Sequence, residues 1–303
     1  MRFTVQQKSI QGKRHENQDR MGYIFTQESL LLVVCDGLGG HEHGEKAASW
    51  LLEALAHRFQ HFAKPQIADP MVFLEASITA AHSLILSRTL SEGLRSSPRT
   101  TVVCALIQNG QVWFAHAGDS RSYLLRGDAV IHRSRDHSKL QYLVDTGRMD
   151  PSEVTHNHPE RNRLINCVGA ELSPRVEHAG PMMLAEDDLI LLCSDGVWGA
   201  LEEQQLLRLI SRAELSQALP NLVSTAHMLA GDTADDATAV AMRWMGSMPE
   251  VGAIDSNTIL PDEFQSTIQV TVAPDAAMDA MTDEEIDEQI RQIHEAIRDN
   301  QKK

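Results

Sequence analysis

The feature that most constrains the fold of this chain is a short apolar run that stops on a carboxylate and then breaks into glycines. Residues 30–35 are apolar throughout, and residues 36–41 read DGLGGH. Such a run is typical of a buried strand, which places Asp36 at the end of that strand. Glycines let the backbone turn sharply and approach a ligand closely. A carboxylate beside permissive backbone suits a hard cation, although Asp-Gly is also an ordinary turn.

Similar junctions between an apolar strand and an acidic turn recur along the chain. In chain order they are Asp36 after residues 30–35, Asp119 after 112–118, Asp195 after 189–194, and Asp235-Asp236 before 237–240. If these turns meet at one end of a sheet sandwich, their carboxylates repel one another unless a cation neutralises them. An all-oxygen ligand set favours magnesium or manganese. Arg14, in the polar loop before the second strand, offers a guanidinium that can recognise a phosphate beside such a site.

Composition narrows the class of protein. The chain has 303 residues, with 42 acidic and 27 basic side chains and a formal net charge of -15. This acidic balance argues against nucleic acid or an anionic membrane as the main partner. The four cysteines are far apart and form no CxxC pair, which predicts reduced residues rather than zinc ligands. The N-terminal residues lack the apolar region of a secretory signal, and no apolar run approaches the ~20 residues of a membrane span. We therefore expect a soluble, cytoplasmic protein.

The spacing of apolar residues predicts alternating groups of strands and helices. Strands are expected over residues 1–10, 21–25, 30–35, 101–107, 112–117, 121–125, 130–132, 175–179, 189–193 and 237–244. Helices are expected over residues 44–62, 69–90, 138–146, 202–210 and 215–229. Asn109-Gly110 between two apolar runs is a strong hairpin signal, and such short connections imply antiparallel pairing. The pattern indicates antiparallel sheets covered by helices, which is a layered α+β arrangement.

The chain changes character after its last predicted strand. We expect one folded domain over residues 1–245, a flexible linker over 246–281 and an acidic C-terminal helix over 282–300. A capping box at residues 282–285 opens that helix. Its apolar seam consists of Ile286, Ile290, Ile293 and Ile297. The seam suits a partner helix or docking back on the domain, and a solvated acidic helix is the other interpretation.

Taken together, these residues resemble the metal-dependent type 2C (PPM) protein serine/threonine phosphatases in their bacterial form. The resemblance spans residues 1 to about 244, with five motifs in family order. The motifs are residues 14–19, 36–41, 118–121, 194–196 and 235–238. The resemblance implies a four-layer α/β/β/α sandwich, in which two antiparallel sheets are flanked by helix pairs. It also implies two Mn²⁺ or Mg²⁺ ions in the cleft between the sheets.

The resemblance assigns a role to each acidic junction. Asp36 would bridge both ions, and the carbonyl of Gly37 would bind one of them. Asp195 and Asp235 would complete the pair of ions. Asp19 would hold a metal-bound water.

Three further assignments follow from the same resemblance. Asp119, together with Asp195, would form a third and weaker metal site. Arg14 would clamp the phosphate of the substrate. Residues 138–168 would form a mobile flap near the substrate entrance.

The implied reaction is hydrolysis of phosphoserine and phosphothreonine on proteins by a metal-activated water. Arg14, Asp36 and Asp195 would carry the catalysis. No phosphoenzyme is needed, so no nucleophilic cysteine or serine is required. The implied partners are phosphorylated proteins and a cognate serine/threonine kinase, and neither nucleic acid nor a membrane is expected to bind.

Several positions depart from the family pattern. Gln18 stands where the family usually has Glu, which would lower metal affinity, and Arg99 stands where it usually has Gly. His41 is a candidate general acid, and a loop-stabilising role is its other interpretation. Four further histidines, His43, His137, His156 and His158, are expected to be surface residues rather than ligands. Gln18 and the isoleucine seam motivate an alternative, which is a catalytically weak pseudophosphatase or scaffold that binds a phosphoprotein.

Overall fold

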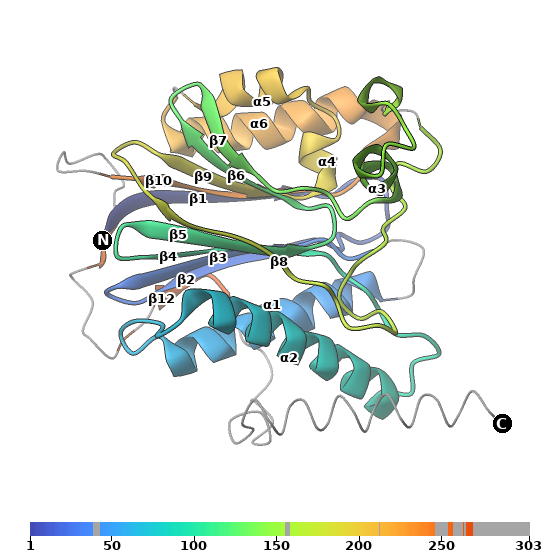
Figure 1. The fold of residues 1–303 in the computed structure, drawn as a ribbon, viewed down its shortest axis with the longest axis horizontal. Helices are drawn as coiled ribbons and strands as arrows, with labels where there is room; N and C mark the ends of the chain where they lie inside the picture. The colour runs from blue at the N-terminus through green and yellow to red at the C-terminus, as the bar shows by residue number, and fades with distance from the viewer. Residues whose placement is uncertain are drawn as a thin grey trace.

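Two antiparallel sheets face each other at the centre of the fold, and helices cover the outer face of each sheet (Figure 1). This arrangement confirms the predicted α/β/β/α sandwich. The computed structural model describes residues 1–38, 43–154, 158–211, 213–245, 254–256, 263 and 265–268. The predicted C-terminal helix over 282–300 lies outside the described residues.

The first sheet carries the strand that ends at Asp36, and its strand order is β12-β2-β3-β4-β5-β8. Its strands are β12 (Gln265–Ser266), β2 (Arg20–Phe25), β3 (Ser29–Cys35), β4 (Val102–Gln108), β5 (Gln111–Ala117) and β8 (Glu177–Met183). Every residue of β3 and β4 is buried, because one face meets the second sheet and the other meets helices. Asn109 and Gly110 both have positive φ, which is the geometry of the predicted two-residue hairpin turn.

The second sheet has the order β11-β1-β10-β9-β6-β7. Its strands are β11 (Ile254–Asp255), β1 (Arg2–Ile10), β10 (Ala237–Trp244), β9 (Leu189–Cys193), β6 (Arg121–Arg126) and β7 (Ala129–Arg133). The β1–β10 pairing joins the two ends of the domain, with Phe3 opposite Trp244 at one end and Ile10 opposite Ala237 at the other. The acidic residues before Ala237 therefore lie beside the polar loop that follows Ile10.

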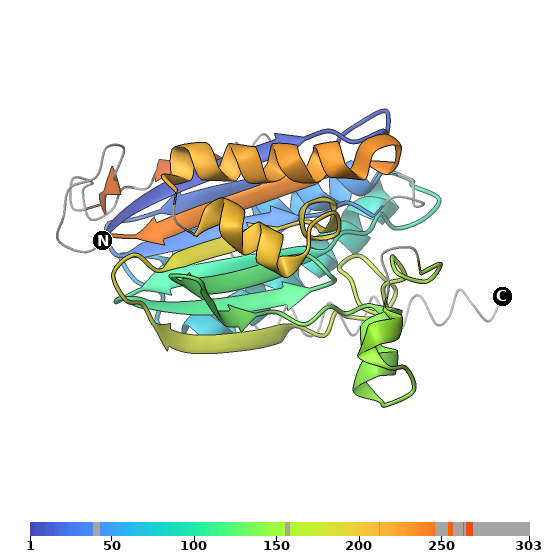
Figure 2. The same ribbon diagram turned by 90° about the horizontal axis from the view of Figure 1, so that it is seen from above.

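Two pairs of helices form the outer layers (Figure 1). The helices and short 3₁₀ turns are α1 (Gly44–Phe62), α2 (Pro70–Ser91), α3 (Lys139–Asp145), η1 (Pro151–Glu153), α4 (Asp195–Trp198), α5 (Glu203–Ile210), α6 (Leu215–Ala230) and η2 (Gly231–Thr233). Helices α1 and α2 cover the first sheet, whereas α5 and α6 cover the second. Helix α3 belongs to the flap, residues 138–168, and lies beyond the end of the sheets (Figure 2).

Helix α2 corrects one sequence-based expectation. By length and composition it could cross a membrane, because an 18-residue window has a mean hydropathy of 1.3. The expectation that no apolar run approaches about 20 residues is therefore wrong for this helix. However, 56% of the window is buried inside the fold, where Leu74, Ile78 and Ile85 pack against α1 and the first sheet. This burial is what a core helix of a globular domain shows.

Residues beyond β10 extend both sheets. Strand β11 pairs with β1, and β12 pairs with β2, so each sheet gains an outermost strand. Ser256 Oγ accepts a hydrogen bond of 2.8 Å from the amino terminus of Met1. Ile268 is 8% exposed and lies so close to Gly22 that a Cβ there would be 2.4 Å from its Cγ1. The expected linker over 246–281 did not anticipate these two strands.

Truncation tests how much these strands contribute. A chain ending at residue 268 should keep the melting temperature of the full chain. A chain ending at residue 245 should still fold but melt roughly 3–8 °C lower, because it loses two strand pairings and the burial of Ile268. Ile268→Asp in the full chain is the matched point variant. Equal melting temperatures for the two truncations would show that the strands add no stability.

Candidate active site

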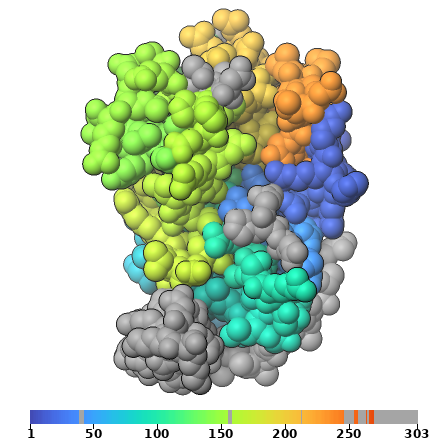
Figure 3. Space-filling view, turned by 90° about the vertical axis from the view of Figure 1, so that its right-hand side faces the viewer, coloured from blue at the N-terminus to red at the C-terminus, as the bar shows by residue number. Residues whose placement is uncertain are grey.

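The predicted acidic turns lie at the end of the sandwich opposite the amino terminus (Figure 1). Asp36 follows β3 of the first sheet, whereas Asp195 opens α4 after β9 and Asp235 precedes β10 of the second. Figure 3 looks onto this end, with the flap in green to yellow-green on one side and the polar loop after β1 in dark blue on the other. The two sheets thus contribute carboxylates to one place.

The charges of five carboxyl groups interact at this place, namely those of Asp19, Asp36, Asp119, Asp195 and Asp235. Asp36 shares a hydrogen bond with Asp195. Burial, followed by the charges of Asp19, Asp195, Asp119 and Asp235, raises the pKa of Asp36 well above its usual value. Burial also raises the pKa of Asp19 to about 8 and that of Asp195 to about 6, where Asp235 adds repulsion. Burial and then Asp195 raise the pKa of Asp119 as well. The charges of Arg161 and Arg14 lower the pKa of Asp195 but do not offset its burial and repulsion, and a bound cation would add the positive charge that is still needed.

Backbone geometry fixes the end of β3. The hydroxyl of Thr101 accepts a hydrogen bond of 3.1 Å from the Asp36 amide, and the Thr100 hydroxyl donates one of 2.9 Å to the Asp36 carbonyl. A Cβ on Gly37 would lie 2.5 Å from the carbonyl oxygen of Gly44. Only glycine fits this close approach. Gly37 is therefore required for steric reasons, in addition to the predicted role of its carbonyl oxygen as a metal ligand.

Arg14 lies at the mouth of the cluster. Its Nη2 is 2.9 Å from Asp235 Oδ2, and its Nη1 donates to Gln18 Oε1 at 3.2 Å. Both members of the Arg14–Asp235 pair are about one-third exposed, at 37% and 29%. The structure therefore places the predicted phosphate-binding guanidinium directly beside a predicted metal ligand.

Two residues that the sequence analysis left without a role hold this loop in place. Asp236 is buried, and its two carboxylate oxygens accept hydrogen bonds of 2.8 Å from the amides of Gly12 and Gln18. Ser194 Oγ donates a hydrogen bond of 2.8 Å to Asp19 Oδ2. The acidic doublet and the Ser-Asp-Gly turn were the only sequence signals for these roles. Both side chains orient predicted ligands or the loop that carries them.

A second group of possible metal ligands lies behind the Asp119 turn. One ligand atom each of His116, His137 and Glu177 lies within 4.8 Å of the others. The two imidazole rings are stacked, with centroids 4.6 Å apart and an interplanar angle of 20°, so their lone pairs do not converge. His137 Nδ1 faces the amide of Gly118 and the side-chain nitrogen of Asn166, which leaves its proton on Nε2, facing Glu177. This geometry suits a hydrogen-bond network better than a metal centre.

The histidine predictions have mixed outcomes. His137 is 9% exposed, so its expected surface position is wrong. It is buried because its ring connects the base of the flap to the turn before Asp119. His41, the candidate general acid, lies outside the described residues.

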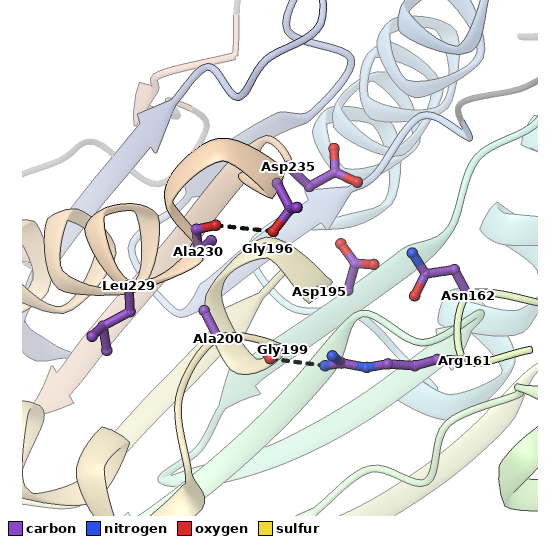
Figure 4. A pocket seen from close by; sticks show the side chains of 10 residues that line it. Arg161, Asn162, Asp195, Gly196, Gly199, Ala200, Leu229, Ala230 and Asp235 are labelled. Atoms are coloured by element: carbon purple, nitrogen blue, oxygen red, sulfur yellow. Dashed lines mark hydrogen bonds between the residues drawn. The ribbon is translucent and has the colours of Figure 1, made fainter. Parts of the chain in front are cut away.

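A cavity of about 350 Å³ opens beside the carboxylates (Figure 4). Its lining combines Asp195 and Asp235 with Arg161 and Asn162 of the flap and with Leu229 of α6. Figure 4 shows the Asn162 amide extending toward Asp195, while Arg161 reaches the carbonyl of the α4 C-terminus. The cavity therefore lies between two predicted metal ligands and two residues of the predicted flap.

Comparison with known proteins identifies similar chains. The family model described as protein phosphatase 2C matches residues 6–239. Serine/threonine protein phosphatase PstP of Mycobacterium tuberculosis is 32% identical over 215 residues, covering 69% of this chain but only 39% of PstP. Serine/threonine phosphatase stp of Listeria innocua is 28% identical over 222 residues, covering 72% of this chain and 87% of stp.

Solved structures show the same fold. The crystal structure of M. tuberculosis PstP/Ppp superposes with a TM-score of 0.70 at 28% identity, covering 81% of this chain and 100% of the other. The catalytic domain of PstP in complex with two manganese ions gives a TM-score of 0.67 at 27% identity, covering 81% and 99%.

The carboxylate cluster predicts a pH dependence of stability in chelator-treated protein. Because the pKa of Asp19 rises from 3.8 to about 8 on folding, the folded state holds a proton that the unfolded state has lost. The stabilising contribution of Asp19 is fully present below pH 3.8 and is lost by about pH 8. Over this range the free energy of unfolding falls by at most ~1.4 kcal/mol per pH unit. Urea unfolding between pH 6.5 and 8.5 measures it as the difference in slope between the wild type and Asp19→Asn, because both proteins share the histidine titrations in this range. Asp19→Asn should flatten the slope, and equal slopes in both proteins would contradict the repulsion.

Proposed function

The chain belongs to the protein phosphatase 2C family, and on that premise we propose that it hydrolyses phosphoserine and phosphothreonine on proteins in a reaction that depends on Mn²⁺ or Mg²⁺. The observation that carries the proposal is the set of buried, mutually repelling carboxylates with a guanidinium at its rim. The relatives named as serine/threonine phosphatases support it.

The residues present fit divalent cations. Their oxygen donors and their raised pKa values both indicate a site built for added positive charge. Asp36, the Gly37 carbonyl, Asp195 and Asp235 would hold two ions, and Asp19 would orient a water beside them. Asp119 and Asp195 would serve a third ion. When bound, these ions supply Lewis acidity and an activated water.

The protein's own groups then have distinct tasks. The Arg14 fork can bind two phosphoryl oxygens and stabilise the charge that develops on them. Asp236 and Ser194 keep the polar loop and Asp19 oriented. Asn162, on the flap wall of the cavity, can donate to a phosphoryl oxygen or accept from a peptide amide.

The wider context follows from this activity. Phosphorylated proteins are the substrates, and a serine/threonine kinase must supply them. We place the protein in the cytoplasm, as its composition suggests. His41 is assigned as the general acid, and the predicted helix over 282–300 as a binding segment for a partner.

The scaffold alternative is less favoured. It rested on Gln18 and on the isoleucine seam of the tail, and Gln18 has a geometric role that needs no charge. Its side chain accepts from Arg14, its amide donates to Asp236, and its carbonyl accepts from Gly37. An amide therefore supports the loop that carries the phosphate-binding arginine.

Loss of metal ligands tests the function. Asp36→Asn and Asp195→Asn should each lower Mn²⁺-dependent hydrolysis of an aryl phosphate and of a phosphothreonine peptide by at least about 100-fold. Their metal-free melting temperatures should equal or exceed that of the wild type, because repulsion is relieved. Wild-type rates in either variant would refute the assignment of ligands.

Gln18→Glu separates the two candidate functions. An added carboxylate should lower the Mn²⁺ concentration for half-maximal activity by several-fold, because it increases the negative charge near the site. Gln18→Ala is the control for loss of the Arg14 contact. If the wild type is folded but inactive at saturating Mn²⁺ while Gln18→Glu is active, the scaffold alternative is correct.

A further inference from the structure

Helix α4 ends in a tryptophan whose position suggests a specific task. The helix is a single turn that begins at the proposed ligand Asp195 and ends at Trp198. The sequence analysis predicted neither this turn nor a role for its aromatic residue. Trp198 is half-buried and packs against the core between the second sheet and its helices. Its other contacts are with the Asp119 turn, with Arg121 and with Arg161 of the flap.

The indole nitrogen contacts the turn that carries the proposed third metal ligand. Trp198 Nε1 donates a hydrogen bond of 3.0 Å to the carbonyl oxygen of Asp119. The other side of this turn is equally constrained, because a Cβ on Gly118, which has φ of 118°, would lie 2.6 Å from side-chain atoms of Thr101. The backbone of this turn is thus held between Thr101, just before β4, and α4.

The ring of Trp198 contacts two guanidinium groups. Arg121 Cζ lies 3.5 Å from the ring centroid, and Arg121 is held there by two hydrogen bonds of 2.8 and 2.7 Å to Asp136. Arg161 Cζ lies 5.4 Å from the same centroid. Both distances lie within the range of cation–π attraction. Arg161 belongs to the flap, so the ring joins the flap to the body of the domain.

The residue after Trp198 completes the attachment. Arg161 Nη2 donates a hydrogen bond of 2.9 Å to the Gly199 carbonyl. A Cβ on Gly199 would lie 2.7 Å from that same Nη2 and 2.5 Å from the carbonyl oxygen of Asp195. Glycine at this position lets the flap arginine approach, as Figure 4 shows along the cavity wall.

We propose that Trp198 is a positioning residue that ties both the Asp119 turn and the flap to the helix carrying Asp195. The indole N–H holds Asp119 in place for the third cation, and the ring face holds Arg161 and with it the flap. The proposal rests on the proposed function, because that function assigns Asp119 and Asp195 as ligands. On this proposal, the weakest cation site depends on the indole N–H, and the position of the flap depends on the ring face.

Two substitutions separate these parts. Trp198→Phe keeps an aromatic face but removes the N–H donor, whereas Trp198→Leu removes both. Calorimetric titration of the full chain with Mn²⁺ should show the weakest site about three- to tenfold weaker in both variants, with the tighter sites unchanged. Trypsin cleavage after the exposed Arg148 of the flap should match wild type in Trp198→Phe and be several-fold faster in Trp198→Leu.

Controls keep the outcome interpretable. Trp244→Phe, at the other end of the β1–β10 pairing, should leave both measurements unchanged. Arg161→Gln removes the flap cation without touching the core, so it should reproduce the faster cleavage even if Trp198→Leu folds poorly.

The results that overturn the proposal differ from those that overturn the function. Wild-type Mn²⁺ binding in Trp198→Phe, or wild-type cleavage in both Trp198→Leu and Arg161→Gln, would refute the role of Trp198 while wild-type activity stands. A wild-type protein that binds no Mn²⁺ and hydrolyses no aryl phosphate would refute the proposed function and this inference with it.

Discussion

Repulsion between buried carboxylates is the constraint around which this structure is arranged. Asp36 comes from one sheet, and Asp195 and Asp235 from the other, so the sandwich itself brings like charges together. The three hydrophobic clusters between the layers of the sandwich are buried. Their burial stabilises the folded state, whereas the carboxylate repulsion destabilises it. A site of this kind is destabilising by itself and is stabilised by what it binds.

Neutral groups hold Asp19 and the backbone of Asp36 in place. Ser194 bonds to Asp19, and Thr100 and Thr101 bond to the backbone of Asp36. None of these contacts adds positive charge, so the groups orient the carboxylates without neutralising them. Preorganised oxygens of this kind need little rearrangement when a cation binds. These contacts leave Asp19 Oδ1 buried and without a hydrogen-bond partner among the described residues.

Local signals made much of this fold predictable, and non-local contacts account for the rest. The helix over 44–62 and the hairpin at Asn109-Gly110 follow from periodicity and turn chemistry. Strand β8 begins and ends later than the expected 175–179, because pairing with β5 decides its extent. Helix α4 is too short to show a period. The family resemblance assigned Asp235 of the acidic doublet as a ligand. Only the folded structure reveals that its neighbour Asp236 holds the polar loop in place.

The position of Arg14 links the two halves of the proposed chemistry. Its Nη2 is committed to Asp235 and its Nη1 to Gln18. The same two N–H groups cannot also form a bidentate pair with a phosphate. The guanidinium has five N–H groups, so three remain for a phosphate. A positive charge at Asp235, which the raised pKa values of the cluster call for, would weaken the Arg14–Asp235 pair and free a further N–H group. A cation bound at this place would thus relieve the carboxylate repulsion and loosen Arg14 from Asp235 at the same time.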